Sequence, residues 1–148
     1  MARAGGSGGA LNTDTAILWP MGALVALTFA VQLQIPLRRF RAGAAKRVTA
    51  ADFRYGESAG VPGDVSIPNR NYINLLEAPV LFYVACLSLY VTSHVDTIAL
   101  AMAWSYVVLR IAHSVVHLTY NRLAHRGSLF ALSNVVLVAL WIRFFATL

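Results

Sequence analysis

Charged side chains are scarce in this sequence. Only 12% of its 148 residues are charged, whereas 58% are hydrophobic, and the mean hydropathy is +0.63. Soluble domains have about a quarter of their residues charged, so the composition excludes an ordinary soluble domain. The length is that of one domain. We therefore expect a single integral membrane domain over residues 1–148.

Cysteine and acidic residues are also few. Cys86 is the single cysteine, which excludes an intrachain disulfide, and its apolar surroundings argue against a nucleophilic thiol. Six acidic residues face 12 Lys and Arg, for a formal net charge of +6. The basic residues lie in loops between apolar runs, so membrane topology explains them better than a nucleic-acid surface does.

Long apolar runs are what the sequence has in abundance. A helix needs about 20 mostly apolar residues to cross a bilayer. The expected spans are residues 16–35, 72–90, 98–118 and 129–147, after a Gly-rich and Ala-rich tail (1–13) that we expect to be disordered. Pro36 should end the first span, because proline lacks an N–H donor. The prediction is an all-α bundle of four membrane helices.

The distribution of Lys and Arg predicts the orientation of these helices. Loop 37–71 and loop 119–128 are rich in basic residues, whereas the link between the second and third spans has none. Basic loops stay on the cytoplasmic side. We therefore expect both loops to be cytoplasmic and both termini to lie outside.

Polar residues follow two of the spans at helical spacing. Ionisable side chains within a span are costly and rare, and they indicate a functional site by default. Each stripe lies on one helix face, toward the cytoplasmic end. The second span carries Arg70, Asn74 and Glu77 at i, i+4 and i+7, and the third carries Arg110, His113, His117 and Tyr120 at i, i+3, i+7 and i+10.

Glu77 is the only acid within the four expected spans, and Arg110 is its expected ionic partner. Such a pair could merely fasten two helices, since buried ion pairs are weak evidence of function. However, pairing with the single acid requires only one cation, and several basic side chains lie near it. The surplus indicates an anionic ligand, either one whose carboxylates suit bidentate arginines or a lipid headgroup. The basic side chains concerned are Arg38, Arg70, Arg110, Arg122, Arg126, His113 and His117.

The spacing of His113 and His117 at i, i+4 also fits two imidazoles on one metal ion. No glutamate lies between them, and the sequence offers no clear third ligand. Two ligands one turn apart cannot reach a haem from opposite faces. We expect no metal, and a histidine-dependent metal or haem oxidoreductase stays as an alternative.

Two blocks of the chain resemble a known membrane family. The first is RNYINLLEAP at residues 70–79, which resembles the R-x-x-x-N-x-x-E signature of the MAPEG family (membrane-associated proteins in eicosanoid and glutathione metabolism). The second is Arg110-Ile-Ala-His113, followed by Arg126 ahead of the fourth span. The resemblance covers nearly the whole chain.

The resemblance implies a homotrimer that binds glutathione between neighbouring subunits near the cytoplasmic face. Arg126 would lie near the glutathione sulfur as the catalytic residue, since a guanidinium favours a thiolate. Arg38 would reach a glutathione carboxylate from the neighbouring subunit. The other glutathione-binding residues implied are Arg70, Asn74, Glu77, Arg110, His113, His117 and Tyr120.

The sequence departs from the family pattern at two positions. Many animal members have tyrosine where His117 stands, and some have another where Phe130 stands. We expect Tyr120 to substitute for the first from one turn further along. The second departure removes a hydroxyl that could touch the sulfur.

The function expected is that of a bacterial-type microsomal glutathione transferase of the inner membrane. It would act on hydrophobic electrophiles, with or without peroxidase activity toward lipid hydroperoxides. One alternative is a non-catalytic protein of the same fold that binds glutathione or lipid, and another is a purely structural bundle.

Overall fold

The computed structural model describes residues 14–148, so the predicted disorder of residues 1–13 lies outside the described residues. Within that range, four helical segments are long and apolar enough to cross a membrane, which confirms the predicted all-α membrane bundle. The second of these segments consists of two helices. The elements are α2 (Leu18–Ala44), the short 3-10 helix η1 (Ala50–Phe53), α3 (Gly63–Leu76), α4 (Ala78–Val91), α5 (Thr97–Leu118) and α6 (Leu123–Thr147).

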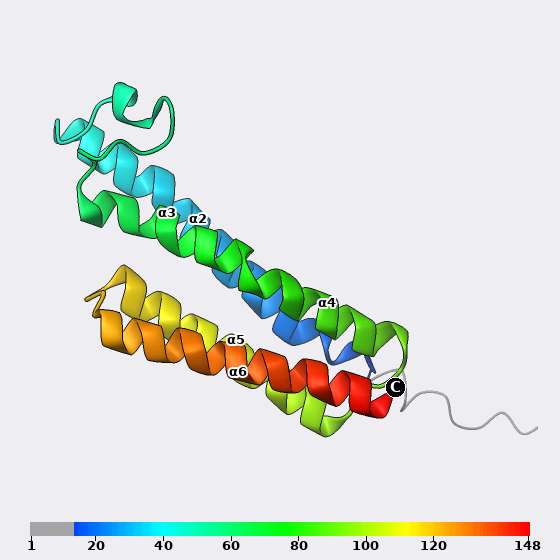
Figure 1. Cartoon of the computed structure of the whole chain (residues 1–148). Coiled ribbons are helices and arrows are strands. Elements are labelled where there is room, and N and C mark those ends of the chain that lie inside the picture. The colour runs from blue at the N-terminus through cyan, green and yellow to red at the C-terminus, as the bar shows by residue number, and fades with distance from the viewer. Residues whose placement is uncertain (1–13) are drawn as a thin grey trace, which may run out of the picture.

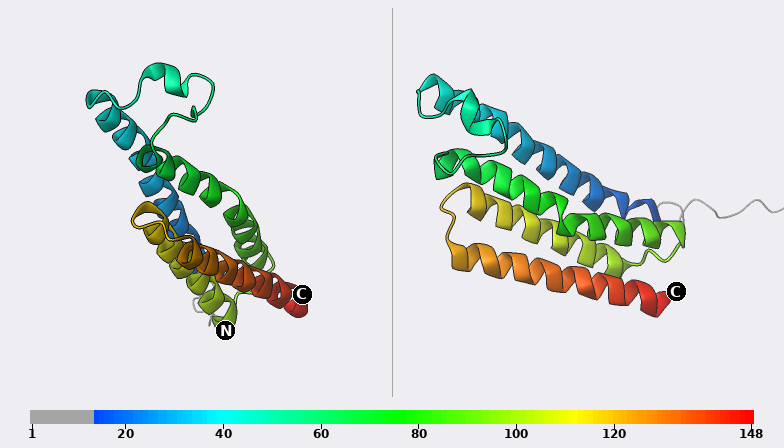
Figure 2. Two further views of the ribbon diagram at one scale, coloured as in Figure 1. Left: turned by 60° about the vertical axis from the view of Figure 1, so that its left-hand side comes forward. Right: turned by 45° about the horizontal axis from the view of Figure 1, so that its top comes forward.

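The helices form two layers (Figure 1). Helix α2 runs beside α3 and α4, and α5 runs beside α6. The loop at 45–62 and the turn at 119–122 lie at one end of the molecule, which we call the basic end. The link between α4 and α5 and the C-terminus lie at the opposite end (Figures 1 and 2).

The core between the layers is apolar and aromatic. Leu24, Phe82, Tyr106 and Leu140 are fully buried, and the rings of Phe82 and Tyr106 stack with centroids 4.6 Å apart. Large apolar side chains are exposed on the outer faces, among them Phe29. Such an outer surface suits lipid, because every backbone polar group of a helix is satisfied within the helix.

Helix α2 continues past Pro36, so the prediction that this residue ends the first helix is wrong. A proline inside a helix costs about 3 kcal/mol, because one hydrogen bond is lost and the ring crowds the preceding turn. The residues after Pro36 recover stability by packing. Ala42 is buried in a small apolar cluster with Val48 and Val65 at the basic end.

A second proline, Pro68, leaves a backbone carbonyl free to bind an arginine. Pro68 lies inside α3 and has no N–H to donate to the carbonyl of Asp64, four residues earlier. That oxygen instead accepts a hydrogen bond of 2.9 Å from Nη1 of Arg38. Nη2 of Arg38 donates to the carbonyl of Leu118 at 3.2 Å. Arg38 therefore ties α2 to both α3 and α5.

The second membrane segment is broken at Glu77, between α3 and α4. Pro79 explains the break, because it cannot donate to the carbonyl of Leu75 and its ring crowds that oxygen. The carbonyl of Asn74, beside the break, accepts a hydrogen bond of 2.7 Å from Nη2 of Arg110. The continuous helix face predicted for the second span thus ends at Glu77.

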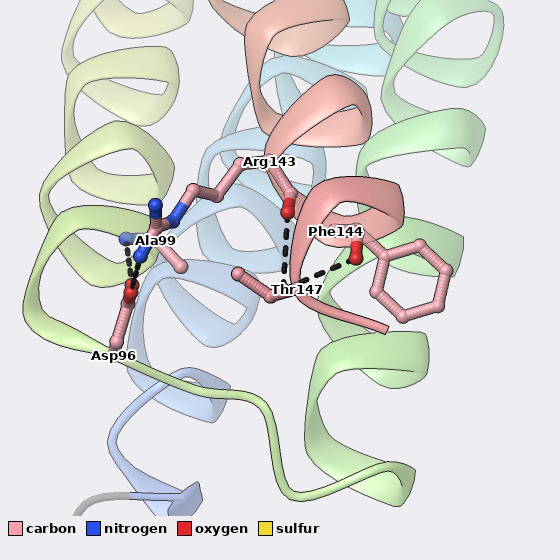
Figure 3. Close-up of polar contacts among 5 residues, drawn as sticks. All are labelled: Asp96, Ala99, Arg143, Phe144 and Thr147. Carbon is pink, nitrogen blue, oxygen red and sulfur yellow. Dashed lines mark hydrogen bonds and ion pairs between the residues drawn. The ribbon is translucent and has the colours of Figure 1, made fainter.

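At the opposite end, a clasp joins α5 to α6 (Figure 3). Oδ1 of Asp96 accepts a hydrogen bond of 2.7 Å from the backbone N–H of Ala99 and so caps α5. Its Oδ2 forms an ion pair with Arg143 of α6. The hydroxyl of Thr147 donates to the carbonyl of Arg143 at 3.0 Å. These contacts close the end of the α5–α6 pair that lies opposite the basic end.

Candidate functional site

A cavity of about 340 Å³ lies between α3, α5 and α6 near the basic end. Its walls combine two arginines, two histidines and an asparagine with one aromatic ring. The lining residues are Arg70, Asn74, His113, His117, Leu123, Arg126, Gly127 and Phe130. A second hollow, about 370 Å³ between α5 and α6 toward the opposite end, is lined without any charged side chain. Of these two, only the first has charged side chains in its lining.

Arg126 occupies the first turn of α6 rather than the loop before it, because this helix begins earlier than predicted. Its Nη1 donates to Nε2 of His117 at 3.0 Å and to Oδ1 of Asn121 at 2.8 Å. Its backbone carbonyl lies 3.1 Å from Nδ1 of His113. Two histidines from successive turns of α5 thus hold Arg126 at the cavity wall.

These contacts fix the proton positions on both imidazoles. A guanidinium has no lone pair to offer, so Nε2 of His117 must accept and the proton of this ring lies on Nδ1. A carbonyl can only accept, so Nδ1 of His113 carries a proton, and in the neutral ring its Nε2 has the lone pair. Nδ1 of His117 and Nε2 of His113 are buried and have no hydrogen-bond partner among residues 14–148. Both nitrogens are enclosed by protein atoms, so these histidines act on the site through their contacts with Arg126.

Arg110 is fully buried behind this wall, and its guanidinium carbon lies 5.6 Å from the ring centroid of Phe130. Besides the bond to Asn74, its Nε and Nη1 have no partner in the described part of the chain. Glu77 is exposed, and the two side chains form no ion pair. The predicted pair is therefore absent within one chain, because Arg110 binds the carbonyl exposed by the helix break instead.

Two further predicted site residues lie outside the cavity. Arg38 binds the backbone of α3 and α5, as described above, and also Oε1 of Gln34 at 3.2 Å. Tyr120 follows the end of α5, is 60% exposed, and has its hydroxyl 3.1 Å from Nδ1 of His125. We expected Tyr120 to substitute for the tyrosine that many animal members of the family have at position 117. Within one chain, its side chain instead points away from that position.

The cavity is electropositive. Arg70 is exposed at its mouth, Arg126 forms part of its wall, and Arg110 lies behind. None of the three forms an ion pair with a residue of the described chain. Unpaired cations near low-dielectric walls attract anions strongly. Across residues 14–148, no three His, Cys, Asp or Glu side chains are grouped so that they could hold a metal ion.

The sequence analysis missed Leu123 and Gly127 of the cavity lining, and it missed Asn121, which contacts Arg126 beside the cavity. Asn121 lies in the turn between α5 and α6 with φ of 46°, a left-handed conformation that asparagine tolerates better than most residues. Its backbone N–H donates to the carbonyl of Val116 at 2.8 Å. The only signal for Asn121 in the sequence is an asparagine in the short link before the basic residues at the start of α6.

The fold and the cavity together define a class: a four-helix membrane protein with a basic cavity among three of its helices. The sequence model of the MAPEG family matches residues 17–146, nearly the whole chain, and the protein belongs to this family. Membership makes it a membrane protein of the family of eicosanoid and glutathione metabolism and confirms the resemblance seen in the sequence. Neither the curated proteins nor the solved structures include a significant match to it.

Proposed function

We propose that this protein is a membrane-bound glutathione transferase that joins the thiolate of glutathione to hydrophobic electrophiles. The observation that carries the proposal is the position of Arg126 in the cavity wall. One nitrogen of its guanidinium is held by two neutral acceptors, and no carboxylate pairs with it. A held, uncompensated cation is what a thiolate nucleophile needs beside it.

The charges of glutathione fit the side chains around the cavity. The tripeptide carries two carboxylates and one ammonium group. Arg70 is exposed at the cavity mouth without an ionic partner, so it can bind one carboxylate. Glu77, exposed at the helix break, can bind the ammonium group. Asn74 in the cavity lining supplies a polar contact to the peptide.

The chemistry requires a thiolate and a nearby electrophile. A free cysteine thiol has a pKa of about 8.5, and a neighbouring guanidinium lowers it. The sulfur lone pair then forms a bond to the electrophilic carbon, and the leaving group departs with its bonding electrons. Holding both reactants in one cavity removes much of the entropic cost of their encounter. Electrophiles dissolved in the bilayer would reach the site from the lipid.

The assembly and orientation form part of the same proposal. The basic end faces the cytoplasm, both termini lie outside, and the membrane is the inner membrane of a bacterium. Three copies assemble, so that Arg38 of a neighbouring subunit adds to the glutathione site. The exposed position of Glu77 supports this arrangement, because a neighbouring subunit would cover the carboxylate.

One specific observation favours a second candidate, a protein of the same fold that binds glutathione or lipid without turnover. Phe130 lines the cavity beside His113, with ring centroids 5.9 Å apart, and provides no hydroxyl. Tyr120 is turned toward His125 instead. The cavity wall therefore has no tyrosine to assist Arg126 at the sulfur.

The test is turnover of glutathione with a chlorodinitrobenzene electrophile by the full chain in lipid vesicles. Arg126→Ala should lower kcat by about 100-fold or more, the usual loss when one preorganised donor to a developing charge is removed. Arg122→Ala is the matched control, because Arg122 is exposed and does not line the cavity. Equal turnover of the Arg126 variant and the wild type would contradict the proposal. Glutathione binding without wild-type turnover would favour the second candidate.

A further inference from the structure

We propose that Asn121, acting with the Nδ1-protonated tautomer of His117, positions Arg126 and keeps its charge available to the sulfur. This inference rests on the proposed function, because it assigns Arg126 to the thiolate. It adds a residue that lies outside the apolar spans, in the turn between α5 and α6, and gives it a role in the reaction.

Asn121 and His117 hold one edge of the Arg126 guanidinium, and we call this pair of acceptors the bracket. Nη1 of Arg126 carries two hydrogens, and the two acceptors, Oδ1 of Asn121 and Nε2 of His117, engage both at 2.8 and 3.0 Å. Nε and Nη2 have no partner among residues 14–148, and neither is one of the buried unpaired nitrogens of that range. The bracket thus fixes one edge and leaves the other edge free for a ligand in the cavity.

The charge of the bracket matters as much as its shape. Both acceptors are neutral, so they orient Arg126 without compensating its positive charge. A carboxylate at either position would hold the side chain equally well but would form an ion pair and weaken the field at the sulfur. A neutral bracket therefore differs from an ordinary salt bridge in its consequence for the thiolate.

The backbone explains why an asparagine can serve here. Position 121 requires φ of 46°, which glycine and asparagine accept with little strain. Only asparagine combines this conformation with a neutral carbonyl oxygen that reaches Arg126. Asn121→Gly consequently removes the acceptor and leaves the turn intact, which separates the positioning role from a structural one.

The experiment follows the ultraviolet absorbance of the thiolate of bound glutathione against pH, with the full chain in detergent. Asn121→Gly and His117→Phe should each raise the midpoint of the thiol titration by about one pH unit, since a hydrogen bond to a charged group contributes on that order. His117→Gln retains a neutral acceptor and should restore most of the shift. Binding of S-methylglutathione, which has no thiol to ionise, should change much less than the midpoint.

Asn121→Asp gives the sharpest distinction. The proposal expects its midpoint to rise, because the carboxylate keeps the bracket but compensates the charge of Arg126. A role in folding or turn geometry alone predicts a wild-type midpoint for this variant. If Asn121→Gly does not fold, the Asp variant and the two His117 variants still decide the matter.

The outcomes separate this inference from the proposed function. A wild-type thiolate signal with unchanged midpoints in the Asn121 and His117 variants would overturn the inference alone. The absence of any thiolate signal in the wild type would overturn the proposed function, and this inference with it.

Discussion

Arg126 has its hydrogen bonds to neutral partners, as Arg38 and Arg110 do, but of these three only Arg126 lines the cavity. Arginines elsewhere in the fold have anionic partners. Arg39 and Arg47 pair with carboxylates at 2.8 and 2.7 Å, and Arg143 pairs with Asp96. Those arginines stabilise the fold through compensated charge. Arg126 instead keeps a positive field directed at the cavity, which is why we assign it to the anionic form of the substrate sulfur.

Arg70 should act on binding rather than on the chemical step. It is exposed at the cavity mouth and forms no hydrogen bond through its side chain to residues 14–148. Arg70→Ala should raise KM for glutathione about tenfold or more with a smaller effect on kcat, because a bond to a carboxylate is made equally in the ground and transition states. Steady-state kinetics in vesicles measure both constants. A fall in kcat at unchanged KM would assign Arg70 to the chemical step instead.

The periodicity of the third span placed Arg110, His113 and His117 on one face, and the structure has all three beside or behind one cavity wall. The same periodicity included Tyr120 in the stripe. It leaves the stripe because α5 ends at Leu118 and the chain turns through a left-handed residue. Helix spacing predicts a shared face only as far as the helix continues, and the apolar run of the third span itself ends at residue 118.

At the level of helices, prolines determine which carbonyls are free to bind arginines. Pro68 leaves the carbonyl of Asp64 for Arg38, and the break caused by Pro79 leaves that of Asn74 for Arg110. The existence of four membrane helices could be predicted because apolar runs of this length have few other uses. The extension of α2 beyond Pro36 could not, since packing at the basic end determines it. The break at Glu77 follows from Pro79, a local signal that the sequence analysis did not use.

The clasp at Asp96 gives a prediction about the α5–α6 pair. Asp96→Ala loses the cap of α5 and the pair with Arg143, so it should destabilise the fold by about 1 kcal/mol, with the ion pair adding little at this exposed site. Asp96→Asn keeps a capping oxygen and should cost less. The melting temperature in detergent should fall by roughly 2–4 °C for the alanine variant. Equal melting of both variants would show that the cap contributes nothing.

The pH dependence of this clasp has a definite sign. The backbone N–H of Ala99 and the guanidinium of Arg143 hold the pKa of the Asp96 carboxyl below its ordinary value. A lowered folded-state pKa contributes stability that is present above the unfolded value, about 3.9, and lost as the pH falls through the folded value. The difference in melting between wild type and Asp96→Asn should therefore shrink below about pH 4.

The whole molecule is asymmetric along its length. The long loop lies at one end, whereas the clasp and the C-terminus lie at the opposite end (Figures 1 and 3). The basic cavity lies toward the end that has the long loop. A bundle with an apolar outer surface and one basic end has a preferred orientation in a membrane. The proposed trimer rests on the family resemblance rather than on a surface pattern, because a face covered by a partner and a face covered by lipid are both apolar.

Cysteine labelling tests this orientation, because the one native cysteine, Cys86, is fully buried and can be replaced by alanine. In that background, Ser93→Cys should react with a membrane-impermeant maleimide applied to intact bacterial cells expressing the protein. Tyr55→Cys, at a residue 90% exposed in the loop of the basic end, should react only after the membrane is permeabilised. The reverse pattern would place the basic end, and the cavity, on the outer side.

The most direct test of Arg126 as the residue that stabilises the thiolate is an ultraviolet difference titration of the purified wild-type protein with glutathione near neutral pH. We predict a saturable thiolate absorbance that is lost in Arg126→Ala and kept in Arg122→Ala. A wild-type protein that binds glutathione without any thiolate signal would contradict the assignment of Arg126 and leave a binding protein in its place.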